Sequence, residues 1–223
     1  MILTIGGILD TGALAKIQAQ LPDLDWKDGS GTAGPQARAV KRNLQADFSK
    51  GVGQDLRRGL REAIAAHPVF RAAAQPRQMS PVMLSRTAEG GGYGLHVDNA
   101  IMQPGSGALR TDLSFTLFLS DPDTYSGGDL VIDGPGSSQS LKPQAGDLVL
   151  YPSTHLHRVE TVTSGVRHAC VGWVESLVRD PVARETLFDL HNLRASLASQ
   201  LDAQSADLLT LNKAIANLLR VMS

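Results

Sequence analysis

The sequence contains a single cysteine, Cys170, among its 223 residues. An internal disulfide is therefore impossible, which excludes a disulfide-stapled scaffold and favours a reducing compartment. Neither positive nor negative charge predominates, because the formal net charge is only −1. A surface that balanced predicts neither nucleic acid nor an anionic membrane as the main partner.

Long apolar runs are missing as well. The segment Met1–Leu9 is apolar, but it has no basic flank and no small-residue cleavage site, and it is far shorter than the roughly 20 residues of a spanning helix. We therefore expect a cytoplasmic protein. Hydrophobic residues make up 42% of the chain and charged residues 19%, which is ordinary for a folded globular domain.

Three regions differ in pattern. Residues 1–77 are predicted to form a mainly helical support region, with one helix beginning at Asp10 or Thr11 and another running from about Asp55 to His67. Residues 179–223 carry two leucine-rich stripes at helical spacing, which are expected to pack on the core or on a second subunit of a homodimer. The stripes are Leu187, Leu190, Leu193 and Leu197, and Leu208, Leu211, Ile215 and Leu219.

The middle region, residues 78–178, consists of short runs rich in valine, leucine and aromatics, separated by Gly, Pro, Asp and Ser clusters. Several short strands at this spacing predict an antiparallel sandwich or barrel. The expected strands are Leu113–Leu119, Asp129–Ile132, Asp147–Tyr151, His157–Val162 and Arg167–Val174.

A candidate metal site begins at His96 and Asp98. In extended chain, side chains two residues apart point to the same side, so this imidazole and this carboxylate can reach one ion. Together they supply two thirds of the facial triad of non-haem iron(II) oxygenases. The third ligand must come from elsewhere, and His157 is the first candidate, with His155 in competition.

Arg167 is the candidate partner for a carboxylate, because a guanidinium binds a carboxylate through two parallel hydrogen bonds. If Thr163–Gly165 forms a three-residue hairpin loop, with Gly165 at positive φ, then Val162 faces Val166 and Arg167 shares a sheet face with His157. A dicarboxylate chelating the metal at one end could then meet Arg167 at the other.

In the local sequence around His96, Asp98, His157 and Arg167, the chain resembles the bacterial PKHD-type hydroxylases. These are a branch of the prolyl-4-hydroxylase-like iron(II)/2-oxoglutarate oxygenases. The likeness covers most of the chain, including a segment near the N-terminus, Lys41–Gln45. The other matching stretches are Gly94–Ala100, Arg110–Ser120, Gly127–Leu130, Ala145–Pro152, Leu156–Val159, Val162–Arg167 and Val178–Asp180.

The resemblance implies an α+β fold with a double-stranded β-helix (jelly-roll) core and flanking helices at both ends. It implies catalytic Fe(2+) at His96, Asp98 and His157, 2-oxoglutarate at Arg167, and L-ascorbate as a reductant. The family usually carries tyrosine where this chain has Thr87, a position expected to contact 2-oxoglutarate. That contact is expected to be weakened or taken over by Tyr93.

The resemblance leads us to predict an oxygenase that hydroxylates an unidentified small molecule or peptide while converting 2-oxoglutarate to succinate and CO2. Two other classes stay open on the residues alone. One is a non-catalytic jelly-roll sensor or carrier that binds metal or 2-oxoglutarate. The other is a cupin-like metal enzyme that uses His155 and His157 together.

Overall fold

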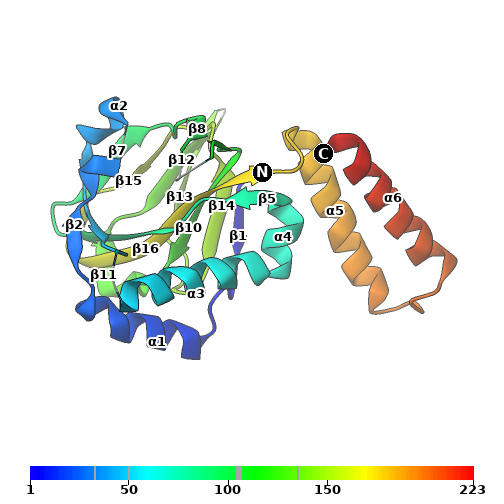
Figure 1. Ribbon diagram of the computed structural model, residues 1–223, viewed down its shortest axis with the longest axis horizontal. Helices are drawn as coiled ribbons and strands as arrows, with labels where there is room; N and C mark the ends of the chain where they lie inside the picture. Colours follow the sequence, from blue (N-terminus) through cyan, green and yellow to red (C-terminus); the bar gives the residue numbers. More distant parts are fainter. Residues whose placement is uncertain (33, 50, 104–106, 135) are drawn as a thin grey trace.

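A computed structural model describes residues 1–32, 34–49, 51–103, 107–134 and 136–223. Its body is a sandwich of two antiparallel sheets with helices on one side, and a helical hairpin extends from that body (Figure 1). The helices are α1 (Thr11–Gln20), α2 (Pro35–Arg38), α3 (Val52–Ala66), α4 (Pro68–Ala74), α5 (Pro181–Ala198) and α6 (Ala206–Met222), with short 3-10 helices η1 (Leu21–Asp23), η2 (Gly29–Thr32) and η3 (Pro122–Thr124).

Among the described residues, the larger sheet has nine strands. Its main order is β1 (Leu3–Ile5), β14 (Leu148–Pro152), β10 (Leu113–Phe118), β16 (Val162–Ser176), β6 (Met83–Ala88), β4 (Leu44–Ala46) and β2 (Trp26–Asp28), and both β11 (Tyr125–Gly127) and β5 (Pro76–Met79) also pair with β16. The smaller sheet has the order β13 (Ser137–Leu141), β12 (Leu130–Gly134), β15 (His157–Val159), β7 (Gly92–His96) and β3 (Lys41–Arg42). A separate pair joins β8 (Ile101–Met102) to β9 (Leu109–Arg110).

Alternation along the strands decides what faces the interior of the sandwich. In β10, Leu113, Phe115 and Leu117 turn outward and pack under the helices in one apolar cluster. The intervening Ser114 and Thr116 turn inward and line a pocket. The strand period of two therefore separates the packing face from the functional face.

The helices bury the outer face of the larger sheet. Leu60 and Ile64 of α3 and Phe70 of α4 lie in the same cluster as the outward residues of β10. Helix α1 begins where predicted, because the Asp10 side chain accepts a hydrogen bond from the Ala13 amide at 2.7 Å, which caps the helix. Among the described residues, no helix is both long and apolar enough to cross a membrane.

The predicted hairpin at Thr163–Gly165 is wrong. Strand β16 runs unbroken from Val162 to Ser176, and Val162 pairs with Gly127 of β11 while Val166 pairs with Ala88 of β6. Gly165 does have a positive φ of 76°, but it serves a close strand contact, since a Cβ there would lie 2.3 Å from the Thr124 carbonyl oxygen. The chain changes sheets between Val159 and Val162 instead of turning back on itself.

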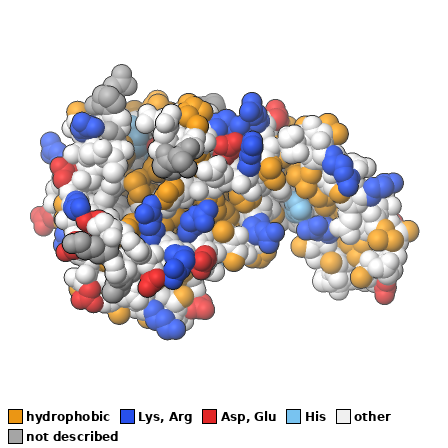
Figure 2. Space-filling view, in the orientation of Figure 1, with side chains coloured by type: hydrophobic (Ala, Val, Ile, Leu, Met, Phe, Trp, Pro, Cys, Tyr) orange, Lys and Arg blue, Asp and Glu red, His pale blue; other side chains and the backbone are white. Residues whose placement is uncertain are grey.

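Part of each C-terminal stripe packs on the other, whereas Leu193 is 48% exposed. Helices α5 and α6 form an antiparallel hairpin around Leu187 and Ile215, which are 1% and 3% exposed. Apolar side chains also remain on the outside of this lobe, among them Leu209 and Val221. Figure 2 shows apolar atoms on the surface of the hairpin as well as on the sandwich body.

Candidate active site

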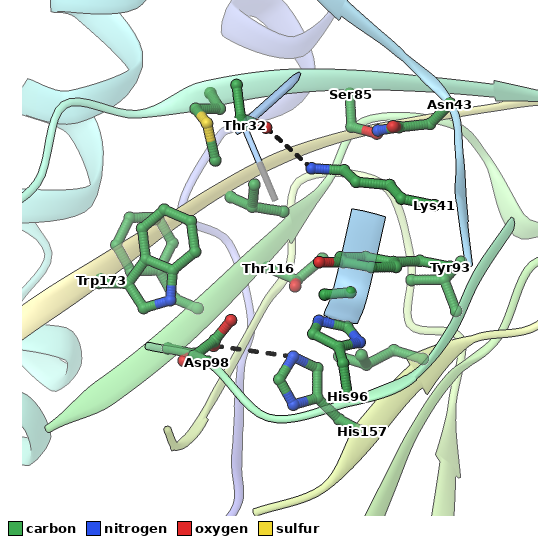
Figure 3. Close-up of a pocket in the computed structure, with 18 of the residues that line it drawn as sticks. Thr32, Lys41, Asn43, Ser85, Tyr93, His96, Asp98, Thr116, His157 and Trp173 are labelled. Atoms are coloured by element: carbon green, nitrogen blue, oxygen red, sulfur yellow. Dashed lines mark hydrogen bonds and ion pairs between the residues drawn. The ribbon is translucent and has the colours of Figure 1, made fainter. Parts of the chain in front are cut away.

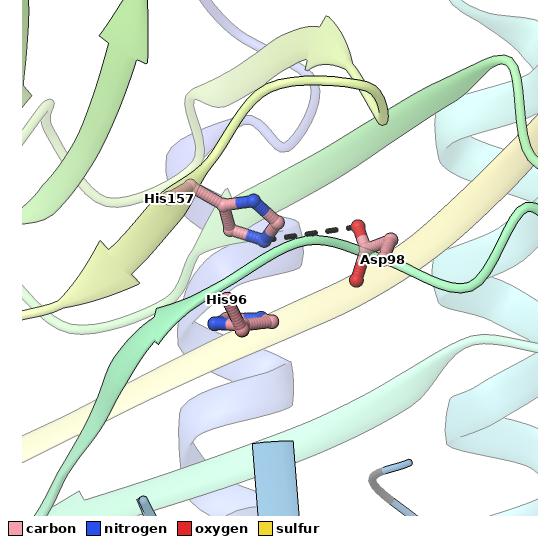
Figure 4. A group of neighbouring side chains, drawn as sticks. All are labelled: His96, Asp98 and His157. Carbon is pink, nitrogen blue, oxygen red and sulfur yellow. Dashed lines mark ion pairs between the residues drawn. The ribbon is translucent and has the colours of Figure 1, made fainter. Parts of the chain in front are cut away.

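Three side chains from two adjacent strands of the smaller sheet converge on one point. His96 ends β7, His157 begins β15, and these two residues are directly paired across the ladder. Asp98 follows β7 by two residues and turns to the same side (Figure 4). One ligand atom from each residue lies within 4.8 Å of the other two. The structure therefore brings together the predicted triad of two nitrogens and one oxygen.

Backbone carbonyls orient both imidazoles. The Nδ1 atom of His96 lies 2.8 Å from the Gly94 carbonyl oxygen, and that of His157 lies 3.0 Å from the His155 carbonyl oxygen. A carbonyl can only accept, so each Nδ1 carries the proton and each Nε2 lone pair is left for a metal. Burial, together with the neighbouring His157, lowers the pKa of His96 to about 4, so its ring is neutral at pH 7.

The carboxylate is held by serine. The Ser114 hydroxyl donates to Asp98 Oδ2 at 2.6 Å and is itself 2.7 Å from the Ser153 hydroxyl. Asp98 Oδ2 lies 3.7 Å from Nε2 of His157. These contacts leave the carboxylate facing the two imidazoles, an arrangement that fits a divalent metal in both donor type and charge. Neither the contact between Ser114 and Asp98 nor the support from Ser153 was predicted from the sequence.

The two competing histidines have different surroundings. His157 is buried at 5% exposure, and its ring joins the triad. The side chain of His155 lies outside this group and outside the residues that line the pocket, and its carbonyl oxygen supports His157. Within the described parts of the chain, the geometry therefore favours His157 as the third ligand and does not bring both histidines to one ion.

Arg167 lies in β16, on the opposite sheet from His157, and it reaches the same pocket from that side. Its side chain is 2% exposed, and its Nε and Nη2 atoms have no hydrogen-bond partner among the described residues. Burial lowers the pKa of the Arg167 guanidinium. An unpaired buried charge is costly, so this arrangement fits a ligand that brings a carboxylate.

The two remaining candidates lie at different places in the pocket. Thr87 is directly opposite Arg167 in the β6–β16 ladder and is 2% exposed. Tyr93 stacks on the ring of His96 with centroids 3.6 Å apart, and burial raises the pKa of its hydroxyl to about 12. All the candidates except His155 line one pocket, together with Lys41 and Trp173, whose place in the site was not predicted from the sequence. Figure 3 shows Tyr93, the triad, Lys41 and Trp173 around this pocket.

Comparison with known proteins agrees with this site. The profile of the 2OG-Fe(II) oxygenase superfamily matches residues 82–175, which span the triad and Arg167. A PKHD-type hydroxylase of Hyphomonas neptunium is 48% identical over 222 residues, covering 100% of this chain and 99% of the relative. One of Synechococcus elongatus is 46% identical over 220 residues, covering 99% and 98%. This chain belongs to the PKHD-type hydroxylase family.

Solved structures share the fold of this PKHD-type hydroxylase at low identity. A prolyl hydroxylase of Trichoplax adhaerens, solved in complex with a hypoxia inducible factor peptide fragment, matches with a TM-score of 0.59 and 14% identity, covering 85% of this chain and 86% of that one. An oxidoreductase of the 2OG-Fe(II) oxygenase family from Burkholderia pseudomallei gives 0.57 and 16%, covering 77% and 82%. The predicted jelly-roll with flanking helices is confirmed.

Family membership also confirms the predicted class of activity. This PKHD-type hydroxylase is an enzyme that depends on iron(II) and 2-oxoglutarate, and its primary substrate is unidentified. The triad fits the metal centre that such an enzyme needs, since two imidazoles and one carboxylate form the facial set of non-haem iron(II) oxygenases.

Proposed function

We propose that His96, Asp98 and His157 hold Fe(II), through the two Nε2 atoms and the carboxylate, in an enzyme that hydroxylates its substrate. In that reaction 2-oxoglutarate and dioxygen become succinate and CO2, with one oxygen atom in succinate and the other in the new hydroxyl group. The observation that carries the proposal is the meeting of three ligand atoms within 4.8 Å in a pocket that also contains the buried, unpaired Arg167.

In this proposal, Arg167 binds the distal carboxylate of 2-oxoglutarate. Its free Nε and Nη2 atoms can donate two parallel hydrogen bonds to the two carboxylate oxygens. Thr87, opposite Arg167, is the proposed hydroxyl partner at that end, and Tyr93, stacked on His96, is placed at the metal end. The tyrosine hydroxyl keeps its proton at neutral pH and can act as a donor.

The protein's own part is positioning and exclusion of water. When bound, iron(II) with 2-oxoglutarate supplies the oxidising chemistry, whereas the chain supplies the triad and a partly enclosed pocket around it. The Ser114 hydroxyl fixes the Asp98 carboxylate, and the Gly94 carbonyl fixes the His96 ring. The neutral His96 imidazole can bind metal without first losing a proton.

We also propose a reductant, a substrate class, a cellular location and an oligomeric state for this enzyme. L-ascorbate is the proposed reductant that keeps the iron ferrous, and the substrate is a small molecule or peptide and not a nucleic acid. A cytoplasmic location suits the single cysteine, Cys170, which is free and buried. A homodimer is supported by the exposed apolar side chains on the α5–α6 hairpin.

The deciding experiment measures succinate formation from 2-oxoglutarate by the purified protein with iron(II) under air. We expect His157→Ala to lower the rate by at least ~100-fold, since removing a first ligand costs more than the 10–100-fold typical of an outer partner. His155→Ala is the matched control and is expected to keep most of the activity, because only its backbone carbonyl is used.

Two results would contradict the proposal. Binding of iron and 2-oxoglutarate without any succinate would indicate the sensor or carrier. Loss of activity in His155→Ala, with activity kept in His157→Ala, would show that the third ligand is assigned to the wrong histidine.

A further inference from the structure

Lys41 is a buried cation in the active-site pocket that the proposed reaction leaves unused. It lies in β3, at the edge of the smaller sheet, opposite Tyr93 of β7. Its side chain is only 9% exposed and turns into the pocket (Figure 3). Its ammonium donates to the Thr32 hydroxyl at 3.0 Å and lies 5.0 Å from the centre of the Tyr93 ring.

The backbone holds Lys41 in this position. The Gly94 amide donates to the Val40 carbonyl at 2.9 Å, which ties the chain just before β3 to the strand that carries His96. A side chain at Gly94 would not fit, because a Cβ there would lie 2.7 Å from the Cβ of Val40. Lys41 is therefore placed by a close backbone contact and not by a flexible surface loop.

The ammonium has no counter-ion among the described residues. The carboxylates of Asp98 and Asp28 act on it only from a distance, and neither lies within 4.0 Å. Burial lowers the pKa of Lys41 to about 8, so the group is still largely protonated at pH 7. Burying a charged group away from water without an opposite charge is energetically unfavourable, and binding of an anion would offset that desolvation penalty.

The other two buried cations, Arg184 and Arg167, differ from each other in their partners. Arg184, 6% exposed, donates to the Val178 carbonyl oxygen at 2.8 Å. Arg167 is unpaired, but the proposed 2-oxoglutarate would supply its carboxylate. Two unmatched cations, Lys41 and Arg167, thus line a single pocket. Because 2-oxoglutarate offers only one carboxylate beyond the one at the metal, one cation is left over.

The surroundings of the two cations indicate which one is left for the substrate. Arg167 is deep in the larger sheet, over the ring of Phe118 and opposite Thr87. Lys41 is in the smaller sheet beside Thr32, and the Tyr93 ring separates its ammonium from His96. A molecule held at Lys41 could therefore extend past Tyr93 to the metal without occupying the site at Arg167.

We propose that Lys41 binds a carboxylate of the primary substrate, so that the enzyme acts on a small organic acid or amino-acid-like molecule. A single ammonium matches a single negative charge, which favours a carboxylate over a phosphate dianion. Trp173, on the opposite wall, supplies an apolar surface and an indole N–H that has no partner among the described residues (Figure 3). This inference rests on the proposed function, since it names the substrate class of the same site.

The test is a panel of small acids, each paired with its neutral primary amide, and including free and N-acylated amino acids. Two quantities are measured on the full-length protein. The first is stimulation of succinate formation with iron(II). The second is the shift in thermal midpoint of the protein loaded with Mn(II) and 2-oxoglutarate, which reports binding without turnover.

We expect some acids to stimulate turnover and raise the midpoint, and their amides to do so at least 10-fold more weakly. A charge-assisted hydrogen bond of this kind is worth on the order of 10- to 100-fold in binding. In Lys41→Met the preference for acid over amide should disappear, and Lys41→Arg should recover part of it. Lys16→Met is the matched control, because it removes an exposed lysine of α1 that does not line the pocket, and it should keep the full preference.

The outcomes separate this inference from the proposed function. If the wild-type protein forms no succinate under any condition, the proposed function fails. If succinate forms but no acid is preferred to its amide by either measure, the role of Lys41 is wrong while the proposed function stands. A higher KM for 2-oxoglutarate in Lys41→Met, with the acid preference intact, would assign Lys41 to the co-substrate and also overturn the inference.

Discussion

The sandwich and the C-terminal hairpin each bury an arginine, and they treat it in opposite ways. Arg184 at the start of the hairpin donates from Nη1 to the Val178 carbonyl oxygen at 2.8 Å. Arg167 in the sandwich is at least as buried, yet two of its nitrogens have no partner among the described residues. A satisfied buried charge indicates a structural role, whereas an unsatisfied one indicates a place for a ligand.

The largest expected effect comes from replacing each arginine by methionine. Arg167→Met should raise the KM for 2-oxoglutarate by roughly 100-fold or more, because removing one partner of a buried ion pair costs about 2–5 kcal/mol. It should leave the stability of the ligand-free protein unchanged or higher. Arg184→Met should do the reverse, with an unchanged KM and a loss of about 1–3 kcal/mol in the free energy of unfolding.

The measurements are steady-state succinate kinetics and denaturant unfolding of both variants without ligand. If Arg167→Met destabilised the free protein as much as Arg184→Met does, the distinction between a structural and a ligand-binding arginine would be lost.

Leu187→Ala tests whether the hairpin is energetically separate from the active site. Leu187 is 1% exposed in a cluster with Val178 and Ile215, apart from the main core. Its truncation should cost about 2–5 kcal/mol, felt mainly within α5 and α6. Hydrogen exchange of the two helices should speed up while the KM for 2-oxoglutarate stays the same. A matching rise in exchange across β10 and β16 would show that the two regions unfold together.

Ser114→Ala tests how strongly the sandwich depends on the groups behind the triad. The Ser114 hydroxyl donates to Asp98 Oδ2, so its loss should weaken Mn(II) binding by about 10- to 100-fold. Calorimetric titration with Mn(II) measures this directly. Ser138→Ala, which removes a similar hydroxyl-to-carboxylate contact at Asp133 on an exposed hairpin, is the control and should bind metal normally.

The smallest predicted effect is on acid stability. Burial, with a smaller contribution from Arg86, lowers the pKa of His168 in the sandwich to about 4. The unfolded chain takes up this proton near pH 6.5, before the folded state does. Stability is therefore fully present above about pH 6.5 and is lost as the pH falls towards 4, by up to about 2 kcal/mol after allowance for partial exposure.

His168→Gln should flatten this part of the stability curve, measured by urea unfolding between pH 4 and 7. His191 of the hairpin is the matched control. Burial, with a contribution from Arg194, also lowers its pKa. We expect His191→Gln to flatten the curve less, because this histidine lies on the smaller α5–α6 hairpin. An equal effect of the two variants would contradict the prediction.

Several parts of the fold could be predicted because their signals are local. The cap at Asp10 and the apolar spacing of α1 define that helix within a dozen residues. The alternation in β10 marks both its packing face and its pocket face. The short strands β1 to β4 were missed, because two or three residues carry too little pattern to distinguish a strand from a loop.

Only part of the candidate site could be predicted from the sequence. The pair His96 and Asp98 is a local motif, so its geometry follows from extended backbone alone. The placement of Arg167 relied on a hairpin that does not form, and it reaches the pocket because β16 belongs to the facing sheet. Lys41 was visible only as part of a resemblance, since nothing in its sequence neighbourhood indicates that its ammonium is buried.

The sequence by itself determined the donor types of the candidate metal site, helices α1, α3, α5 and α6, the strand-rich middle and the family to which the chain belongs. Tertiary structure alone decided that Arg167 faces the triad from the other sheet and that Lys41 is a second unmatched cation in the same pocket. It also brought His157, and not His155, into the triad, a choice that the residues alone left open and that the resemblance favoured. The reason is physical. Residue type and spacing act within a few residues, whereas burial and the lack of a partner depend on every segment that folds around a side chain.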